Sequence, residues 1–312
     1  MRLDGFLRGE PETAAREAAR LEELGYDGVW TTETRHDPFL PLALAGAATT
    51  RVTLGTAIAT AFTRSPWVTA VTAWDLQRLS SGRFVLGLGT QVRAHNERRF
   101  SVPFEAPGSK LRELVEALRH IWGAFQGEHR LRFRGRFYRH DLLTPFFDPG
   151  PLDAGPPPVH LAAVTPTMYR IAGEVADGVQ VHPFHTARYL REVAVPALGR
   201  PIPLAAAVFC VVGADDLAVR QQIAFYGSTP TYRPVFEVHG WGDLTESLHR
   251  LMARRDVAAM AAAITDDVLA EFAVFGSTWA EAVAALRARY EGLLERVAVY
   301  GGGDVGAVAE TW

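Results

Sequence analysis

Residues 52–89 read VTLGTAIATAFTRSPWVTAVTAWDLQRLSSGRFVLGLG, and this stretch decides the fold. Val52–Ile58 and Phe84–Gly89 are short apolar runs of the kind that form buried strands. Pro66–Leu79 between them is predicted to be a helix, because Ser65 can cap its first turn and a Ser-Ser-Gly sequence ends it. A strand, a helix and a strand in succession predict parallel strands joined by a crossover helix.

The same unit recurs along the chain. Further strands are predicted at Leu3–Leu7, Gly28–Thr31, Val159–Val164, Val179–Val181, Leu204–Val212 and Arg296–Tyr300. Further helices are predicted at Pro11–Leu24, Pro41–Thr49 and Pro166–Ala176. Eight strands in a chain of 312 residues fit an α/β (β/α)8 TIM barrel with insertions. An open, doubly wound sheet is the alternative, but it needs a glycine-rich phosphate loop after the first strand, and Gly5-Phe6-Leu7-Arg8-Gly9 is not one.

Composition favours a single globular domain over residues 1–312. The chain is 48% hydrophobic, with 32 basic and 35 acidic residues and a formal net charge of −3. This balance gives no reason to expect nucleic acid or a membrane surface as a partner. The chain has one cysteine, Cys210, no apolar run long enough to span a membrane, and a start unlike a signal peptide. We therefore expect a cytoplasmic protein with no disulfide.

Two intervals are too long for simple loops and are predicted to be insertions after strands 4 and 7. Thr90–Pro158 contains a helix from Lys110 to Phe125 and then a run that alternates like a small hairpin. Gly213–Glu295 is predicted to be mostly helical. The aromatic segments Phe133–Phe147 and Phe225–Trp241 within them have two interpretations, a wall of a hydrophobic pocket or a dimer surface.

Four blocks of sequence resemble the luciferase-like monooxygenase superfamily, and they occur in the family's order. They are GYDGVWTTETRHDPF (25–39), LGTAI (54–58) with RSP (64–66), SGRFVLGLG (81–89), and ADG (176–178). Within the superfamily, the ETRHDPFLPLALA and AFYGSTP blocks are most similar to the branch that uses the deazaflavin coenzyme F-420. The resemblance implies a TIM barrel with a flavin-type cofactor at the carboxyl ends of its strands.

The resemblance and the strand ends together predict the site. Candidate cofactor contacts follow strands three to six: Thr56, Ala57, Ile58, Gly89, Thr90, Gln91, Ala163, Val164, Thr165 and His182. Relatives carry a bulge at Ala57-Ile58, often with a non-proline cis peptide, that supports the ring. His36 and Glu33 are the candidate catalytic residues, because a histidine oriented by a carboxylate can donate a proton near neutral pH.

Each candidate also has a structural interpretation. His36 and Asp37 can be a plain loop pair in which Asp37 caps the next helix. Gly87 and Gly89 can relieve crowding inside the barrel instead of making room for a ring. Thr165 can cap a helix, bind the cofactor phosphate, or do both.

Two histidines, one cysteine and three arginines have further interpretations. His182 and His185 have HxxH spacing, but two ligands make no metal site, so we expect no metal. Cys210 is predicted to be inert packing in a strand. Arg35, Arg64 and Arg93 are rim arginines that meet the anionic tail of coenzyme F-420 or stay solvated.

Three functions are compatible with these features. The first is an oxidoreductase that transfers hydride between coenzyme F-420 and an unidentified small organic substrate. The second is a monooxygenase that uses FMN and O2, for which an NADPH-dependent flavin reductase would be the partner. The third is a non-catalytic binding protein on the same fold. Luciferase-like barrels commonly pair, so a homodimer is expected in each case.

Overall fold

The computed structural model describes residues 1–301 and 303–312. The chain forms two compact units, each assembled from separate segments. The amino-terminal unit comprises Phe6–Ala162 and Glu174–Gln180. The carboxyl-terminal unit comprises Met1–Gly5, Ala163–Gly173 and Val181–Trp312.

The amino-terminal unit is built on parallel strands that run in the order β2-β3-β5-β8-β9. These strands are Gly28–Thr31, Thr53–Thr56, Phe84–Gly89, Val159–Ala163 and Gly178–Val181. In the register, Trp30 lies beside Gly55, and Leu86 lies beside Val159. A two-residue strand, β4 (Ala59–Thr60), continues from β3 and pairs with the end of β5. Mostly buried strands of this kind are typical of parallel sheets covered by helices.

The helices of this unit lie close to where the sequence predicts them, apart from α4, which was not predicted. They include α1 (Ala14–Glu23) after the short 3-10 helix η1 (Pro11–Thr13), α2 (Leu40–Ala48), α3 (Pro66–Leu79) and α4 (Arg93–Arg98). Ser65 accepts the N–H of Val68 at 3.2 Å and so caps α3. Gly25 follows α1 with φ of 90°, a conformation that glycine adopts without steric cost.

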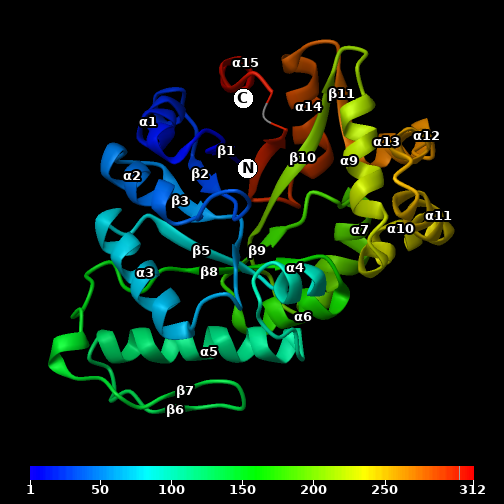
Figure 1. Ribbon diagram of the computed structural model, residues 1–312. Coiled ribbons are helices and arrows are strands. Elements are labelled where there is room, and N and C mark those ends of the chain that lie inside the picture. The colour runs from blue at the N-terminus through cyan, green and yellow to red at the C-terminus, as the bar shows by residue number, and fades with distance from the viewer. Residues whose placement is uncertain (302) are drawn as a thin grey trace. The chain divides into compact units, whose positions relative to one another are not determined.

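Helix α5 (Pro107–Phe125) separates the strands from a small hairpin. The hairpin consists of β6 (Phe133–Arg134) and β7 (Arg139–His140), and η2 (Pro145–Phe147) follows it. Figure 1 shows α5 with β5 and β8 on one side and the hairpin on the other. Glu113 of α5 accepts the backbone N–H groups of Arg136, Phe137 and Tyr138, which fixes the hairpin turn on the helix. This hairpin therefore lies outside the helix layer of the unit, and Phe146 beyond it is 91% exposed.

The carboxyl-terminal unit contains parallel strands in the order β11-β10-β12-β1. They are Ala273–Gly276, Leu204–Val212, Arg296–Tyr300 and Arg2–Phe6. An ion pair is buried among them. Arg296 donates from Nε to Asp4 at 2.9 Å and from Nη2 at 2.6 Å, and the two side chains are only 6% and 4% exposed.

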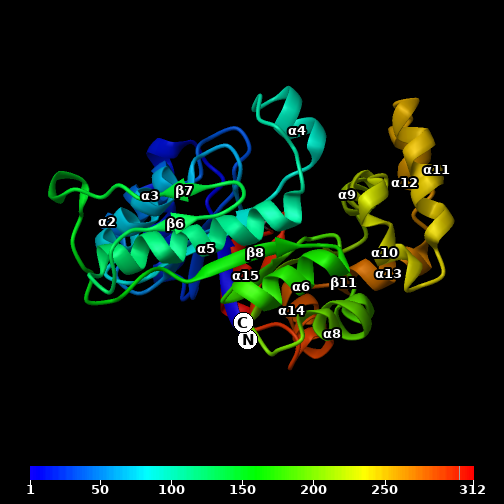
Figure 2. The same cartoon turned by 90° about the horizontal axis from the view of Figure 1, so that it is seen from below.

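The helices of the carboxyl-terminal unit follow its strands and fill the interval after β10. The elements are α6 (Pro166–Val175), α7 (Ala187–Tyr189), a π-helical turn η3 (Leu190–Ala194), α8 (Val195–Leu198), α9 (Leu217–Gly227), η4 (Pro230–Tyr232), α10 (Arg233–Glu237), α11 (Gly242–Ala253), α12 (Val257–Ala262), α13 (Asp266–Phe272), α14 (Trp279–Tyr290) and α15 (Val305–Thr311). Figure 2 shows α9, α10, α11 and α12 grouped together. Phe236 of α10 is fully buried there and packs edge-on against Phe272 and Phe184.

All eight predicted strands are present in the described residues, each parallel to its neighbours within its unit. The alternation of strand and helix is that of a (β/α)8 barrel, which confirms the predicted fold class. Elements that were not predicted include β4, α4, η2, β11 and α15. No helix of the described chain is long and apolar enough to cross a membrane. The assignment of residues 1–312 to one domain stays a prediction.

Candidate functional site

In the amino-terminal unit, the carboxyl end of β3 carries an apolar step made by Ala57 and Ile58, which we call the ledge. The peptide bond between these residues is cis. Both side chains are half-buried, whereas Thr56 before them and Ala59 after them are buried. The side chain of Ile58 fills the space beside Gly89 at the end of β5, where an added Cβ would come within 2.8 Å of it. The ledge is thus an accessible apolar surface at strand ends, where barrels of this class place their chemistry.

Glu33 holds the ledge in place from the loop after β2. Its backbone N–H donates to the carbonyl of Ile58 at 3.2 Å. Its carboxylate accepts the N–H of Thr60 at 2.6 Å. Glu33 therefore bonds the backbone on both sides of Ala59, and its side chain is only 10% exposed.

Arg64 balances the buried charge of Glu33. Its guanidinium donates to both carboxylate oxygens of Glu33 at 3.0 Å, and to Asp37 at 2.8 Å. Burial disfavours the charge of Arg64, but the hydrogen bonds and charges of Glu33 and Asp37 outweigh that effect, so the pKa of Arg64 is raised. Arg64 is 19% exposed and is not the free rim arginine that the sequence allowed.

Asp37 caps helix α2, as its structural interpretation predicted. Its Oδ1 accepts the N–H groups of Phe39 and Leu40 at 2.8 and 3.1 Å.

The other two predicted rim arginines, Arg93 and Arg35, are exposed. Arg93 forms an i,i+4 ion pair with Glu97 at 2.7 Å, and Arg35 lies on the loop after β2.

His36 pairs with a different carboxylate from the one predicted. Its Nε2 lies 3.0 Å from Oε2 of Glu10, and the two side chains are 36% and 54% exposed. Glu33 is not its partner, because both oxygens of Glu33 bind Arg64. The expected Glu33–His36 pair is thus corrected to two separate pairs, and the catalytic role of either residue stays a prediction.

Gly87 is required by packing, which supports its structural interpretation. A Cβ at this position would lie 1.8 Å from the carbonyl oxygen of Thr56. The hydroxyl of Thr56 donates to the carbonyl of Gly87 at 2.6 Å and lies 2.9 Å from its amide N–H. These two hydrogen bonds hold β3 against β5 directly before the ledge, where Thr56 is fully buried.

Thr90 and Gln91, which follow β5, are half-buried, and Gln91 has φ of 55°.

In the carboxyl-terminal unit, His182 follows β9 and is held as a neutral ring. Its Nδ1 accepts the N–H of Phe184 at 3.0 Å, so the proton of the neutral ring sits on Nε2. Burial, with the nearby His185, lowers the pKa of His182 to about 3. His185 is buried against Tyr290, and burial lowers the pKa of this second histidine to about 4. Within the described residues no three His, Cys, Asp or Glu side chains gather as a metal site.

Two tyrosine hydroxyls meet beside His182. The Oη atoms of Tyr226, in α9, and Tyr300, the last residue of β12, are 2.7 Å apart. The ring of His182 packs edge-on against Tyr226 at 4.6 Å and tilts against Tyr232 at 4.9 Å. Sequence reasoning did not select these tyrosines, although Tyr300 stood at the end of a predicted strand and Tyr226 lay in a block that carried the resemblance.

Thr165 directly precedes α6 and forms the predicted cap. Met168 donates its N–H to the carbonyl of Thr165 at 2.9 Å, with the hydroxyl at 3.4 Å. Val164 accepts the hydroxyl of Tyr189 at 2.6 Å. Thr165 and Val164 are half-buried and Ala163 is buried, so the first two are open to a ligand. Phosphate contact at this helix start stays a prediction.

Cys210 lies in β10 with its thiol in a poorly solvated position. Burial raises the pKa of this thiol to about 12, and its Sγ lies 3.7 Å from the carbonyl oxygen of Val208. Such a thiol is a weak nucleophile. This supports the interpretation of Cys210 as packing.

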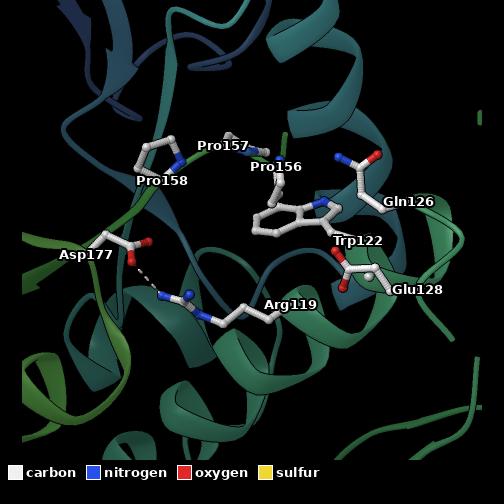
Figure 3. Close-up of a pocket in the computed structure, with 9 residues that line it drawn as sticks. Arg119, Trp122, Gln126, Glu128, Pro156, Pro157, Pro158 and Asp177 are labelled. Atoms are coloured by element: carbon white, nitrogen blue, oxygen red, sulfur yellow. Dashed lines mark hydrogen bonds and ion pairs between the residues drawn. The ribbon is translucent and has the colours of Figure 1, made fainter. Parts of the chain in front are cut away.

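A groove of about 460 Å³ opens at the opposite ends of the amino-terminal unit's strands. Figure 3 shows Arg119 directed at Asp177, with the indole of Trp122 facing a run of three prolines. The guanidinium donates to Asp177 at 2.9 Å. Pro158 and Asp177 precede β8 and β9, so this groove is at the amino ends of the strands. Active sites of such barrels lie at the carboxyl ends, so the groove is not a candidate for the active site.

Comparison with known proteins assigns the family. The family model for luciferase-like monooxygenases matches residues 5–296. The chain is also 48% identical over 315 residues to the uncharacterized protein Rv1360 of Mycobacterium tuberculosis, with 95% of this chain and 92% of that protein covered. The chain therefore belongs to the luciferase-like monooxygenase family.

Relatives with described activities include users of coenzyme F-420. The chain is 35% identical over 185 residues to an F-420-dependent glucose-6-phosphate dehydrogenase of Intrasporangium calvum, which covers 54% of this chain and 53% of that protein.

Solved structures confirm the fold. The coenzyme F-420-dependent tetrahydromethanopterin reductase of Methanopyrus kandleri superposes with a TM-score of 0.76 at 22% identity, covering 99% of this chain and 95% of that chain. An FMN complex of the oxygenating constituent of 3,6-diketocamphane monooxygenase from Pseudomonas putida gives 0.68 at 14% identity, covering 99% and 95%. Both solved structures thus share the fold of this chain over nearly its whole length.

Proposed function

We propose that this protein is an oxidoreductase that uses coenzyme F-420 to exchange hydride with a small organic substrate. The observation that carries the proposal is the ledge, a half-buried apolar surface at the strand ends of the amino-terminal unit, in a chain whose relatives include F-420-dependent enzymes. The deazaflavin ring would supply the hydride chemistry when bound.

The residues at the ledge fit a flat, uncharged ring. Ala57 and Ile58 offer aliphatic side chains, and Thr90 and Gln91 follow at the end of the neighbouring strand with polar groups that can meet ring heteroatoms. The nearby carboxylate of Glu33 is paired with the guanidinium of Arg64. A planar aromatic system gains by covering such apolar atoms.

This chain's own contribution is to position the ring and to exclude water. Glu33 keeps the ledge fixed through Ile58 and Thr60, so it is a positioning residue in this proposal and not a proton donor. His36 would supply the polar contact or proton on the loop after β2. Ala163, Val164, Thr165 and His182, which belong to the carboxyl-terminal unit, stay predicted cofactor contacts, and Thr165 directly before α6 suits a phosphate.

Titration of the purified protein with coenzyme F-420 tests the proposal. We expect a change in deazaflavin fluorescence with a dissociation constant in the micromolar range, and weaker competition by FMN. No fluorescence change would overturn the proposal. Oxygen uptake with reduced FMN would instead support the monooxygenase alternative, for which a flavin reductase would be needed.

Homodimer formation is also proposed. Exposed apolar residues on α2 and α3 support it, among them Leu40 at 64% exposure, Leu44 at 45% and Val68 at 49%. Such residues favour association when they gather on one face. Sedimentation of the purified protein measures the oligomeric state, and a monomer at micromolar concentration would contradict the proposal.

A further inference from the structure

The hydroxyls of Tyr226 and Tyr300, which we call the tyrosine pair, form a hydrogen bond that leaves one proton unused. Two phenols carry two protons, and their mutual contact at 2.7 Å uses one of them. The other O–H has no acceptor among the described residues. Both side chains are half-buried, so water or a ligand can reach the pair.

The surroundings of the tyrosine pair are aromatic and uncharged. The ring of Phe209 lies 4.6 Å from that of Tyr300, and His182 lies 4.6 Å from Tyr226. His182 adds a second donor, because Phe184 occupies its Nδ1 and leaves the proton on Nε2. Within the described part of the chain, no arginine or lysine pairs with these side chains.

Tyr226 stays protonated and His182 stays neutral across the physiological pH range. Burial and the bond to Tyr300 raise the pKa of Tyr226 above its ordinary value. Burial lowers the pKa of His182 to about 3. The set therefore offers hydrogen-bond donors without positive charge.

We propose that the tyrosine pair binds the carbonyl or hydroxyl oxygen of an uncharged substrate, and that this pair selects ketones or alcohols over carboxylates and phosphates. The assignment of this oxygen to the substrate rests on the proposed function. A carbonyl oxygen accepts the unused proton, and the aromatic rings cover the substrate's carbon skeleton. An anion is disfavoured, because its charge would be desolvated with no cation to pair with it.

The ring carbonyls of a deazaflavin are a second source of the same acceptor chemistry. A pair that served the cofactor would change cofactor affinity when one hydroxyl is removed. A pair that serves the substrate would leave cofactor affinity unchanged. The experiment therefore measures both ligands on the same variants.

The probes are two ketones, acetophenone and cyclohexanone, and their anionic counterparts, benzoate and cyclohexanecarboxylate. Ligand-observed NMR gives their affinities for the full-length protein with and without coenzyme F-420. Infrared spectroscopy of carbonyl-labelled acetophenone reports a hydrogen bond to the bound ketone as a lower carbonyl stretching frequency. The variants are Tyr226→Phe and Tyr300→Phe, and Tyr290→Phe is the matched control, since its hydroxyl is buried with no hydrogen-bond partner.

We expect the ketones to bind at millimolar concentration or below, and the carboxylates at least about tenfold more weakly. Removal of the hydroxyl that carries the unused proton should weaken ketone binding about three- to tenfold, the range for loss of one neutral hydrogen bond, so at least one of Tyr226→Phe and Tyr300→Phe should show this loss. The stretching frequency of bound acetophenone should rise in the variant that loses this donor and stay unchanged in Tyr290→Phe.

Four results would overturn the inference. They are equal binding of ketones and carboxylates, no ketone binding at millimolar concentration, an unchanged carbonyl stretch in both variants, and a loss of F-420 affinity in place of ketone affinity. Failure of the proposed function is separate, because it appears as no F-420 binding to the unsubstituted protein, whereas the ketone series is also measured without cofactor.

Discussion

The strand ends of the amino-terminal unit are charged, and those of the carboxyl-terminal unit are neutral. In the first, Glu33, Arg64 and Asp37 form a network whose outer member is 35% exposed. In the second, His182 and the tyrosine pair meet without a formal charge. The carboxyl-terminal unit has its own buried ion pair, Asp4–Arg296. This pair lies away from the carboxyl ends of the strands, because Arg296 is the first residue of β12.

This difference separates two tasks. The carboxylate of Glu33 in the amino-terminal unit is directed at the protein's own backbone, since it accepts the N–H of Thr60. The neutral donors of the carboxyl-terminal unit have capacity left for a ligand. A charged network fixes a surface, whereas uncharged donors recognise an uncharged group. Substitutions can test this division, beginning with the largest expected effect.

Replacing Arg296 with Met should lower the free energy of unfolding by about 3–5 kcal/mol, because the buried carboxylate of Asp4 would lose its cationic partner. Urea denaturation measures this loss. The double variant Asp4→Leu with Arg296→Met should recover most of it, since no charge then remains buried. A loss below about 1 kcal/mol in the single variant would show that the pair is not a buried charge in solution.

Replacing Arg64 with Met should lower the free energy of unfolding by about 2–3 kcal/mol, less than for Arg296, because the site is partly exposed. The same variant should bind coenzyme F-420 about tenfold more weakly, because Glu33 no longer holds the ledge firmly. Arg93→Met is the control, since its exposed i,i+4 pair should contribute less than about 0.5 kcal/mol. Equal effects of the two substitutions would contradict the positioning role of Glu33.

Acidification should destabilise the protein through its neutral histidines. The pKa values of His182 and His185 are about 3 and about 4 in the folded protein, below the ordinary 6.5. The unfolded chain therefore binds more protons between pH 4 and 6.5, and the free energy of unfolding rises with pH in that window. Each histidine should account for about 2 kcal/mol between pH 5 and 7.

Urea denaturation across this pH range measures how the free energy of unfolding changes with pH. In His182→Gln this slope should fall by the amount that corresponds to about one proton taken up on unfolding. The Gln side chain retains both a donor and an acceptor, so a loss of folding is not expected to obscure the comparison. An unchanged slope would mean that His182 is solvated and titrates normally.

Replacing His36 with Ala should change the free energy of unfolding by less than about 1 kcal/mol, because its pair with Glu10 is exposed. Affinity for coenzyme F-420 should also stay the same if His36 acts on the substrate. A tenfold weaker fluorescence titration would instead place His36 on the cofactor ring.

Much of the fold could be predicted from sequence because its signals are local. Helix α3 and strands β5, β10 and β12 have the predicted bounds, since Ser65 and the flanking glycines mark their ends. Strand β11 was missed because Ala273–Gly276 is a short run inside a mostly helical interval. The four-residue apolar run before Ser277 was its available signal.

The site was less predictable because its contacts are long-range. Glu33 and Arg64 are 31 residues apart, and spacing alone does not choose Arg64 over the nearer His36 as the partner. The position of both residues after neighbouring strands was a usable signal. The tyrosine pair joins residues 74 apart, which no local pattern connects.

Chemical labelling of the Cys210 thiol can report unfolding of the chain. With a pKa of about 12, only about one thiol in 10⁵ is ionised at pH 7, so maleimide reagents should spare the folded protein. The unfolded chain exposes an ordinary thiol that reacts readily. Since the sequence contains no second cysteine, the extent of labelling counts opening events of β10 directly, and any thiol introduced elsewhere becomes a unique attachment point.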